Sequence, residues 1–386
     1  MIHFTEEQKM MQEMVRKLVK DKVAPRAAEI DETDEFPWDI AKVFGENGLL
    51  NLVLPEEYGG VNANNTTLCI VIEEIAKVSP ACGLTVFTTQ ALLNVLVRGG
   101  NEEQKNRFFP KFASADKICA FVLTEPNSGS DAASIQTKAI LDGDSYVFNG
   151  NKIFISTGEV SDFYLVFAMT RPGEGAKGMS AFIVEKGTPG FSFGKKENKM
   201  GLRGNPTVEL IFEDARVPKE NLLGEEGRGW KMLTEYGNLM RTWGAASTSL
   251  GIAEGALEYA TGYAKERIQF GRPIGSFQAI QFMLADMAIL TEAAKSLIYR
   301  ASWMIDQGTE SSSKIEPMVS MAKCFTTDTA MKVTTDAVQI LGGYGYTKEY
   351  PVERMMRDAK GVQIFDGTNQ IQRIIISRNL LGKVTA

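Results

Sequence analysis

The sequence is poor in the residues from which many hydrolytic and metal centres are built. His3 is the one histidine among 386 residues, so a histidine-rich metal site, a Ser-His-Asp triad and a Cys-His dyad inside the fold are close to excluded. Four scattered cysteines form no CxxC pair, which argues against zinc and iron–sulfur centres, and we predict no metal site. Acid–base work must therefore fall to carboxylates, lysines, tyrosines or a cofactor.

Signals for targeting and for nucleic acid are also scarce. The N-terminus lacks an apolar signal core and an Arg/Ser-rich transit segment, and no run of 18 uncharged apolar residues stands out, so no membrane span is expected. A net charge of −6 gives no basic surface that would follow a phosphate backbone, so nucleic acid is not an expected partner. The cysteines are typical of buried thiols in a reducing compartment, which predicts a cytoplasmic protein.

Three regions of the chain differ in residue pattern, and they predict its domains. The first is dominated by helical periodicity, the second by short β-branched and aromatic runs between Gly, Asn, Asp and Pro, and the third by long helical patterns. We therefore predict an α+β fold, with an N-terminal helical domain (1–115), a middle antiparallel β-barrel or sandwich (116–226) and a C-terminal four-helix bundle (227–386).

Local signals place several helix boundaries. Thr5, followed by two glutamates, is typical of a helix N-cap with an acidic first turn. Ser276 is expected to cap a helix that runs towards residue 307, and a final helix should follow Gly367. Further helices are expected over residues 67–77, 83–97, 230–270 and 315–341.

Six ordered strings carry a resemblance to a known family. They are FVLTEPNSGSD (121–131), NGNKIFISTG (149–158), GLRGNPTVEL (201–210), ERIQFGRPIGSFQAIQ (266–281), QILGGYGYTKEYPVERMMRDAK (339–360) and IFDGTNQIQR (364–373). Together they resemble the acyl-CoA dehydrogenase family, flavoproteins that desaturate acyl-CoA thioesters. The resemblance covers essentially the whole chain and is strongest to the short-chain, butyryl-CoA-dehydrogenase-like branch. It implies the family's helical, β and four-helix-bundle domains.

The resemblance implies FAD as the cofactor, with its isoalloxazine held by the first two strings. Thr124 would offer a hydroxyl to the pyrimidine end, and Ser156 a hydroxyl near the hydride-accepting nitrogen. The family often has Trp and Thr where this chain has Phe154 and Ser156, which is a mild departure. Without the resemblance, the first string is an ordinary turn and the second a strand with one core aromatic. The implied residues are Phe121, Leu123, Thr124, Ser130, Phe154 and Ser156, with Ser130 facing flavin phosphate or the CoA arm.

The adenine half of FAD is held in the family partly by the neighbouring subunit. This implies at least a dimer, and usually a homotetramer arranged as a dimer of dimers. Without the resemblance, FGRP is a turn and LGGYG a helix stop. The implied residues are Arg267, Phe270, Gln278, Gln339, Gly342, Gly343, Thr368 and Gln370.

The resemblance also points to the base that would remove the substrate's α-proton. Short-chain members carry Glu-Gly-Thr where this chain has Asp366, Gly367 and Thr368, so Asp366 occupies the base position. Other branches place a glutamate one position before Arg241, and here that residue is Met240. Arg241 is expected to support the loop that holds Asp366. In the family, a flavin hydroxyl and the backbone N–H of the base residue polarise the thioester carbonyl. The other implied substrate contacts are Ser130, Thr89, Gln90, Met240, Phe365 and Gly367.

The aspartate leaves several interpretations open. Its carboxylate is retracted by roughly 1.5 Å, about one C–C bond, compared with glutamate. The space so freed could admit an alicyclic or α-branched acyl group such as cyclohexanecarboxyl. Alternatively, Asp366 is a helix N-cap in a slow or degraded member. A straight short-chain dehydrogenase, a nitroalkane-oxidase-like enzyme and a non-catalytic flavin or acyl-CoA scaffold remain rival functions. For a dehydrogenase, the expected electron acceptor is an electron-transferring flavoprotein.

Overall fold

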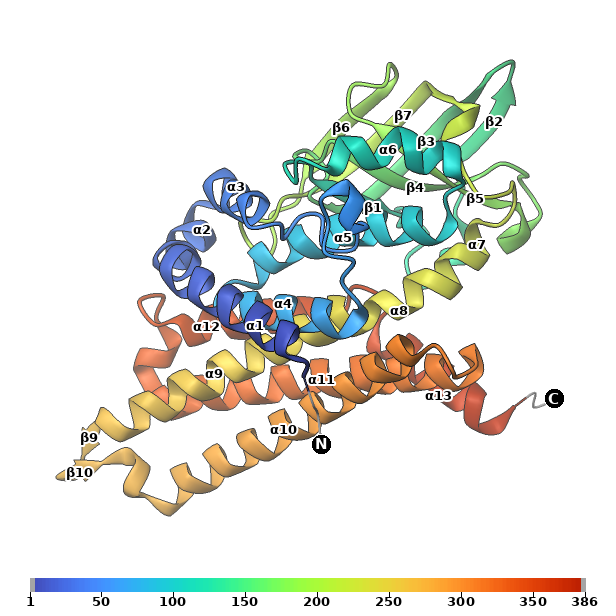
Figure 1. Ribbon diagram of the computed structural model, residues 1–386. Helices are drawn as coiled ribbons and strands as arrows, with labels where there is room; N and C mark the ends of the chain where they lie inside the picture. The colour runs from blue at the N-terminus through green and yellow to red at the C-terminus, as the bar shows by residue number, and fades with distance from the viewer. Residues whose placement is uncertain (1–3, 383–386) are drawn as a thin grey trace.

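Helical segments lie at both ends of the chain, and a sheet lies between them (Figure 1). The computed structural model describes residues 4–382, so His3 lies outside the described residues. The observed order of a helical region, a sheet and a second helical region confirms the predicted fold class. The sheet lies at one end of the molecule and the long C-terminal helices at the other (Figure 1).

Helix α1 begins where the Thr5 signal predicts, whereas the helices expected from residues 67 and 83 begin at Asn65 and Pro80. The Thr5 hydroxyl accepts a hydrogen bond from the Gln8 N–H at 3.2 Å, and the Gln8 side chain accepts from the Thr5 N–H at 3.0 Å, which completes a capping box. The helices are α1 (Glu6–Leu18), α2 (Ala27–Thr33), α3 (Trp38–Glu46), α4 (Asn65–Ala76), α5 (Pro80–Gly99) and α6 (Glu102–Phe112).

Helix α5 needs a separate comment because its length and composition would suffice to cross a membrane. The prediction that no segment is apolar enough to span a membrane therefore overlooked this helix. Most of its residues are buried within the protein, and one such helix is also what the core of a soluble domain produces.

The middle region forms one sheet of eight strands in the order β6-β7-β3-β2-β4-β5-β8, with β1 also paired to β4. Most neighbours are antiparallel, as predicted, but β1 and β2 each pair with β4 in parallel. The connection from β1 to β4 contains β2 and β3, and the connection from β2 to β4 contains β3, so both are long crossovers of the kind that parallel pairing requires. The strands are β1 (Cys119–Val122), β2 (Lys138–Asp142), β3 (Ser145–Ser156), β4 (Phe163–Met169), β5 (Met179–Glu185), β6 (Phe191–Lys196), β7 (Thr207–Pro218) and β8 (Leu222–Leu223).

The C-terminal region is a bundle in which α9, α10 and α11 lie side by side (Figure 1). The prediction that Ser276 caps α10 is wrong, because Phe277 is the N-cap residue and the Ser276 hydroxyl donates to the Pro273 carbonyl at 2.7 Å. Helix α12 was not predicted, whereas α13 follows Gly367 as expected. The helices are α7 (Gly229–Met232), α8 (Asn238–Arg241), α9 (Ser247–Glu266), α10 (Gln278–Gln307), α11 (Ser312–Leu341), α12 (Pro351–Val362) and α13 (Asn369–Leu381).

The GLRG string joins the three regions. The Leu202 N–H donates to the buried Asp358 carboxylate of α12 at 2.5 Å, and the Arg203 guanidinium donates to the Asp31 carbonyl of α2 at 2.6 Å. Arg357 of α12 also forms an ion pair with Asp31 at 2.6 Å. Burial raises the pKa of Asp358 to about 6. These contacts fix α12, and therefore the start of the loop that follows it.

Candidate active site

The segment between α12 and α13, residues 363–368, is called the base loop here because it carries Asp366. Asp366 has φ +60° and Gly367 has φ +83°, a left-handed pair that turns the chain sharply before α13. The N-cap of α13 is Thr368, whose hydroxyl accepts from the Ile371 N–H at 3.3 Å. The alternative that Asp366 is the helix N-cap is therefore wrong, and its carboxylate has no capping role.

Neighbouring side chains hold the base loop by its backbone. Arg241 Nε donates to the Asp366 carbonyl at 3.0 Å, and Gln372 Nε2 donates to the Gly367 carbonyl at 3.0 Å. The φ angle of Gly367 favours glycine, and a Cβ atom there would lie 2.7 Å from Gln372 Nε2, so a side chain would displace the amide that holds the loop. The side-chain carboxylate of Asp366 is left available.

Three buried polar atoms around the base loop have no hydrogen-bond partner among the described residues. They are Asp366 Oδ2, Arg241 Nη1 and Gln372 Oε1. An unsatisfied buried polar atom costs about 1–3 kcal/mol, so a group of three calls for an explanation other than stability. A ligand that supplies donors and acceptors at this point would satisfy them.

Burial raises the pKa of the Asp366 carboxyl above its usual value. The positive charges of Arg241 and Lys323 act in the opposite direction, as does the backbone N–H of Ala245. A carboxylate with a raised pKa is a stronger base while it remains ionised at neutral pH. Met240, at the alternative base position, is buried and carries no titratable group.

Two charged residues of α11 near this centre were missed from the sequence. Lys323 has a fully buried side chain, and burial lowers its pKa to about 8. Glu316 accepts from Asn238 Nδ2 at 2.9 Å and attracts the Arg241 guanidinium. Their seven-residue spacing places both on one helix face, which the sequence does reveal, but only the fold shows that this face meets the base loop.

The residues implied for the isoalloxazine gather where β1 and β3 end. The Ile153 N–H donates to the Thr124 carbonyl at 2.9 Å, which joins the two strings. An irregularity in β3 between Lys152 and Ile155 leaves Phe154 at φ +58° with 60% of its surface exposed. A left-handed aromatic residue is strained, and such strain is characteristic of functional sites. Four further residues of the implied set, namely Phe121, Leu123, Thr124 and Ser156, are half-buried, and Ser130 is exposed.

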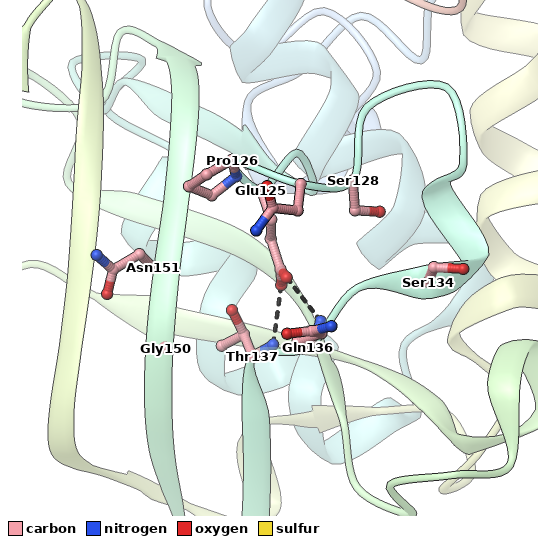
Figure 2. Close-up of a pocket in the computed structure, with 9 residues that line it drawn as sticks. Glu125, Pro126, Ser128, Ser134, Gln136, Thr137, Gly150 and Asn151 are labelled. Atoms are coloured by element: carbon pink, nitrogen blue, oxygen red, sulfur yellow. Dashed lines mark hydrogen bonds between the residues drawn. The ribbon is translucent and has the colours of Figure 1, made fainter.

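A cavity of about 350 Å³ lies beside the segment that follows β1, residues 125–137 (Figure 2). Its wall is braced by Glu125, whose carboxylate accepts from the Gln136 and Thr137 N–H groups at 2.6 and 2.9 Å and from Lys152 Nζ at 2.9 Å. The Lys152 side chain is fully buried, which lowers its pKa to about 8. The cavity is lined by Glu125, Pro126, Asn127, Ser128, Ser134, Gln136, Thr137, Gly150 and Asn151.

Replacement of Lys152 by methionine is expected to lower the free energy of unfolding by about 3 kcal/mol, because Glu125 would keep a buried charge without its cation. Chemical denaturation measures the change. The double variant Lys152→Met with Glu125→Gln should recover part of the loss, and Lys195→Met, which removes an exposed lysine of β6, should cost little. Equal stabilities of Lys152→Met and Lys195→Met would contradict the importance of the pair.

Six of the residues implied for the adenine half lie at the end of the bundle away from the base loop: Arg267, Phe270, Gln278, Gln339, Gly342 and Gly343. The hairpin of β9 (Ile268–Gln269) and β10 (Arg272–Pro273) projects there, away from the sheet (Figure 1). Phe270 at its tip has φ +51° and is 94% exposed. Arg267 lies over the Tyr344 ring, 5.2 Å from its centroid. Gln278, Gln339, Gly342 and Gly343 are exposed there. Thr368 and the exposed Gln370 lie elsewhere, at the start of α13 next to Asp366.

Two residues implied for the substrate are already engaged by the protein. Gln90 is fully buried, and its amide accepts from the Val53 N–H at 3.1 Å and donates to the Leu49 carbonyl at 3.3 Å. The hydroxyl of buried Thr89 accepts from the Cys119 N–H at 3.2 Å. Phe365, by contrast, is half-buried against the bundle core. Thr89 and Gln90 expose no surface in this structure, so the predicted contacts from these two residues to a substrate are not supported.

The chain is similar to known proteins over nearly its whole length. The acyl-CoA dehydrogenase N-terminal, middle and C-terminal domain families match residues 5–116, 120–215 and 227–381. An acyl-CoA dehydrogenase of Bacillus subtilis is 50% identical over 99% of this chain and 100% of its own. A cyclohex-1-ene-1-carbonyl-CoA dehydrogenase of Syntrophus aciditrophicus is 47% identical over 99% of this chain and 91% of its own.

Solved structures agree with the fold. A structure named for the electron-transferring flavoprotein of Acidaminococcus fermentans contains a chain with a TM-score of 0.95 and 47% identity, covering 99% of this chain and 100% of that one. Butyryl-CoA dehydrogenase of Megasphaera elsdenii has a TM-score of 0.94 and 41% identity, covering 98% of this chain and 99% of that one.

Proposed function

The chain belongs to the acyl-CoA dehydrogenase family of FAD-dependent oxidoreductases, and from this premise we propose that it desaturates a CoA thioester with Asp366 as the base. The observation that carries the proposal is that Asp366 Oδ2 and Arg241 Nη1 are both buried and find no hydrogen-bond partner among the described residues. A carboxylate held in this way is ready to take a proton from a bound substrate.

The base loop would both bind the thioester and remove its α-proton. An α-proton is too weakly acidic for a carboxylate unless donors polarise the thioester carbonyl. We infer that the backbone N–H of Asp366 is one such donor, and no hydrogen bond among the described residues uses it. Arg241 then holds the Asp366 carbonyl, so the donor and the base move as one unit.

The residues present suit FAD. Exposed Phe154 and Phe270 offer aromatic surface, and Arg267 offers a guanidinium to a pyrophosphate. A Cβ atom at Gly342 or Gly343 would meet nothing within 4 Å, so the backbone there is open to a close ligand. FAD supplies the acceptor for the hydride from the β-carbon. Phe121 of β1, Ser156 of β3 and the loop residues Leu123, Thr124 and Ser130 would hold its isoalloxazine and pyrophosphate ends.

The residues implied for the isoalloxazine belong to the sheet region, whereas the β9–β10 hairpin, which carries Phe270 next to Arg267, lies at the other end of the molecule (Figure 1). This separation supports a cofactor site shared between two subunits, and we propose a homotetramer built as a dimer of dimers. The Acidaminococcus structure supports an electron-transferring flavoprotein as the acceptor. A cytoplasmic location is proposed on the composition of the sequence alone.

The shorter base favours an acyl group with a bulky α-carbon. Aspartate leaves space next to the α-carbon that glutamate would fill, and the relative of Syntrophus aciditrophicus is named for an alicyclic thioester. We therefore propose an alicyclic or α-branched acyl-CoA such as cyclohexanecarboxyl-CoA as the substrate. A straight short-chain substrate is the second candidate, supported by the likeness to the butyryl-CoA dehydrogenase of Megasphaera elsdenii.

A panel of thioesters tests this substrate. Under anaerobic conditions, cyclohexanecarboxyl-CoA should bleach the flavin about tenfold faster than butyryl-CoA does, and Asp366→Glu should reverse the preference because its longer side chain fills the same space. Stopped-flow absorbance measures both rates. Faster turnover of cyclohexanecarboxyl-CoA by the glutamate variant would end the space argument. Rapid oxygen consumption with small nitroalkanes would instead favour an oxidase.

A further inference from the structure

A buried lysine lies next to the proposed base without touching it. Lys323 of α11 has a fully buried side chain, and its Nζ donates to Asn369 Oδ1 at 2.9 Å and to the Gln363 carbonyl at 3.4 Å. Gln363 begins the base loop and Asn369 directly follows it. A lysine is rarely buried unless its charge has a partner or a task.

Helix α11 holds both ends of the base loop through three side chains. Asn369 Oδ1 accepts from Lys323 Nζ and lies 3.0 Å from the Thr327 hydroxyl, whose single proton it shares with the Lys323 carbonyl at 2.9 Å. Asp328 Oδ1 accepts from Gln363 Nε2 and from Asn369 Nδ2, both at 2.7 Å. The position of Asp366 between these ends therefore depends on one face of α11.

Of the two carboxylates near Lys323, Asp328 already has a cation as an ion-pair partner, whereas Asp366 has none within ion-pair distance among the described residues. Asp328 is shared with Arg373 at 2.7 Å, and Arg241 is attracted by Glu316 as well as by Asp366. Among the described residues, Lys323 forms no ion pair within 4.0 Å. The titratable groups that face it are Asp366, Arg241, Cys324 and Asp328, and those that face Asp366 are Arg241 and Lys323.

We propose that Lys323 is a positioning residue for proton abstraction, which holds the base loop through Asn369 and Gln363 and keeps the Asp366 carboxylate ionised from a distance. This inference rests on the proposed function of Asp366 as the base. The positive charge of Lys323 lowers the pKa of Asp366, because a nearby cation favours the charged form of a carboxyl. Loss of the cation should therefore raise the pH at which the base becomes active.

Three variants separate the charge of Lys323 from its hydrogen bonds. Lys323→Met removes both, and Lys323→Gln removes the charge and keeps an amide donor. Thr327→Val removes a neutral hydroxyl that lies 3.0 Å from the same Asn369 oxygen and 2.9 Å from the Lys323 carbonyl. Lys295→Met is the matched control for a lost, partly buried lysine, because Lys295 pairs with Glu73 and Glu254 in a cluster of α4, α9 and α10.

The measurement is the anaerobic rate of flavin reduction at saturating thioester across a pH series. Both Lys323 variants should move the midpoint of the acidic limb upward by about one pH unit and slow the reaction about tenfold below that midpoint. Thr327→Val should slow the reaction without moving the midpoint. Lys295→Met should lower the melting temperature and leave the pH profile as in the wild type.

An unmoved midpoint in both Lys323 variants would overturn the proposal, as would an equal shift in Thr327→Val, since either result would leave Lys323 a structural role only. The function of Asp366 is tested separately with Asp366→Asn. Full flavin reduction by that variant would defeat the base assignment itself. Loss of reduction in Asp366→Asn together with unshifted Lys323 variants would defeat the positioning role alone.

Discussion

Replacement of Asp366 by asparagine is expected to slow flavin reduction by about a thousandfold, which is the loss typical of a missing general base. Asparagine has nearly the same shape but cannot accept the α-proton. The loop contacts from Arg241 and Gln372 use backbone carbonyls and should survive, so the affinity for thioester should change little. Stopped-flow reduction and thioester titration measure the two effects separately.

A matched control is Asp142→Asn, which removes an exposed aspartate of β2 that pairs with Arg216 on the surface. It should reduce the flavin at the wild-type rate. Full activity of Asp366→Asn would end the assignment of Asp366 as the base. Equal losses of rate and affinity would instead indicate that the variant disturbs binding.

The same variant should be more stable than the wild type at neutral pH. Burial raises the pKa of Asp366 in the folded protein, so the folded state holds this proton more tightly than the unfolded state does. The favourable contribution is complete below the unfolded pKa and is lost as the pH rises through the folded pKa. Asparagine never ionises, so its advantage in melting temperature should appear at pH 7 and shrink towards pH 4.

Replacement of Arg241 by methionine is expected to be the second largest effect, a fall in kcat of about a hundredfold. Arg241 Nε holds the Asp366 carbonyl at 3.0 Å, and a small displacement of the loop would move the carboxylate and the Asp366 N–H away from the reacting atoms. The guanidinium is buried, and burial lowers its pKa, so its retention despite this cost indicates a specific task.

The conservative variant Arg241→Lys sharpens this test. Lysine keeps the charge but loses the planar guanidinium whose Nε reaches the loop, so most of the loss should remain. Steady-state kinetics should show the change in kcat rather than in KM. Exposed Arg228, replaced by lysine, serves as the control and should have no effect. A change confined to KM would contradict a positioning role for Arg241.

Much of the site was readable from short strings, because those signals depend on residues close together in the chain. Asp366, Gly367 and Thr368 stand in order within IFDGT, and Phe154 stands within NKIFISTG. The role of each residue within a string was harder to predict. Thr368, and not Asp366, caps α13, since capping depends on the backbone angles that the left-handed pair at 366 and 367 imposes.

The sequence alone determined the α, β and α order and the family, and it proposed Asp366 as the base, since residue periodicity and motif order survive without coordinates. Only the tertiary structure decided what surrounds that base. Lys323 meets Asn369 across 46 residues, and Arg241 meets Asp366 across 125. The parallel pairing of β1 and β2 with β4 also joins segments that are distant in the sequence, so the sequence did not reveal it. Contacts between distant segments depend on how whole helices and strands pack, and that packing brings a buried cation to one aspartate.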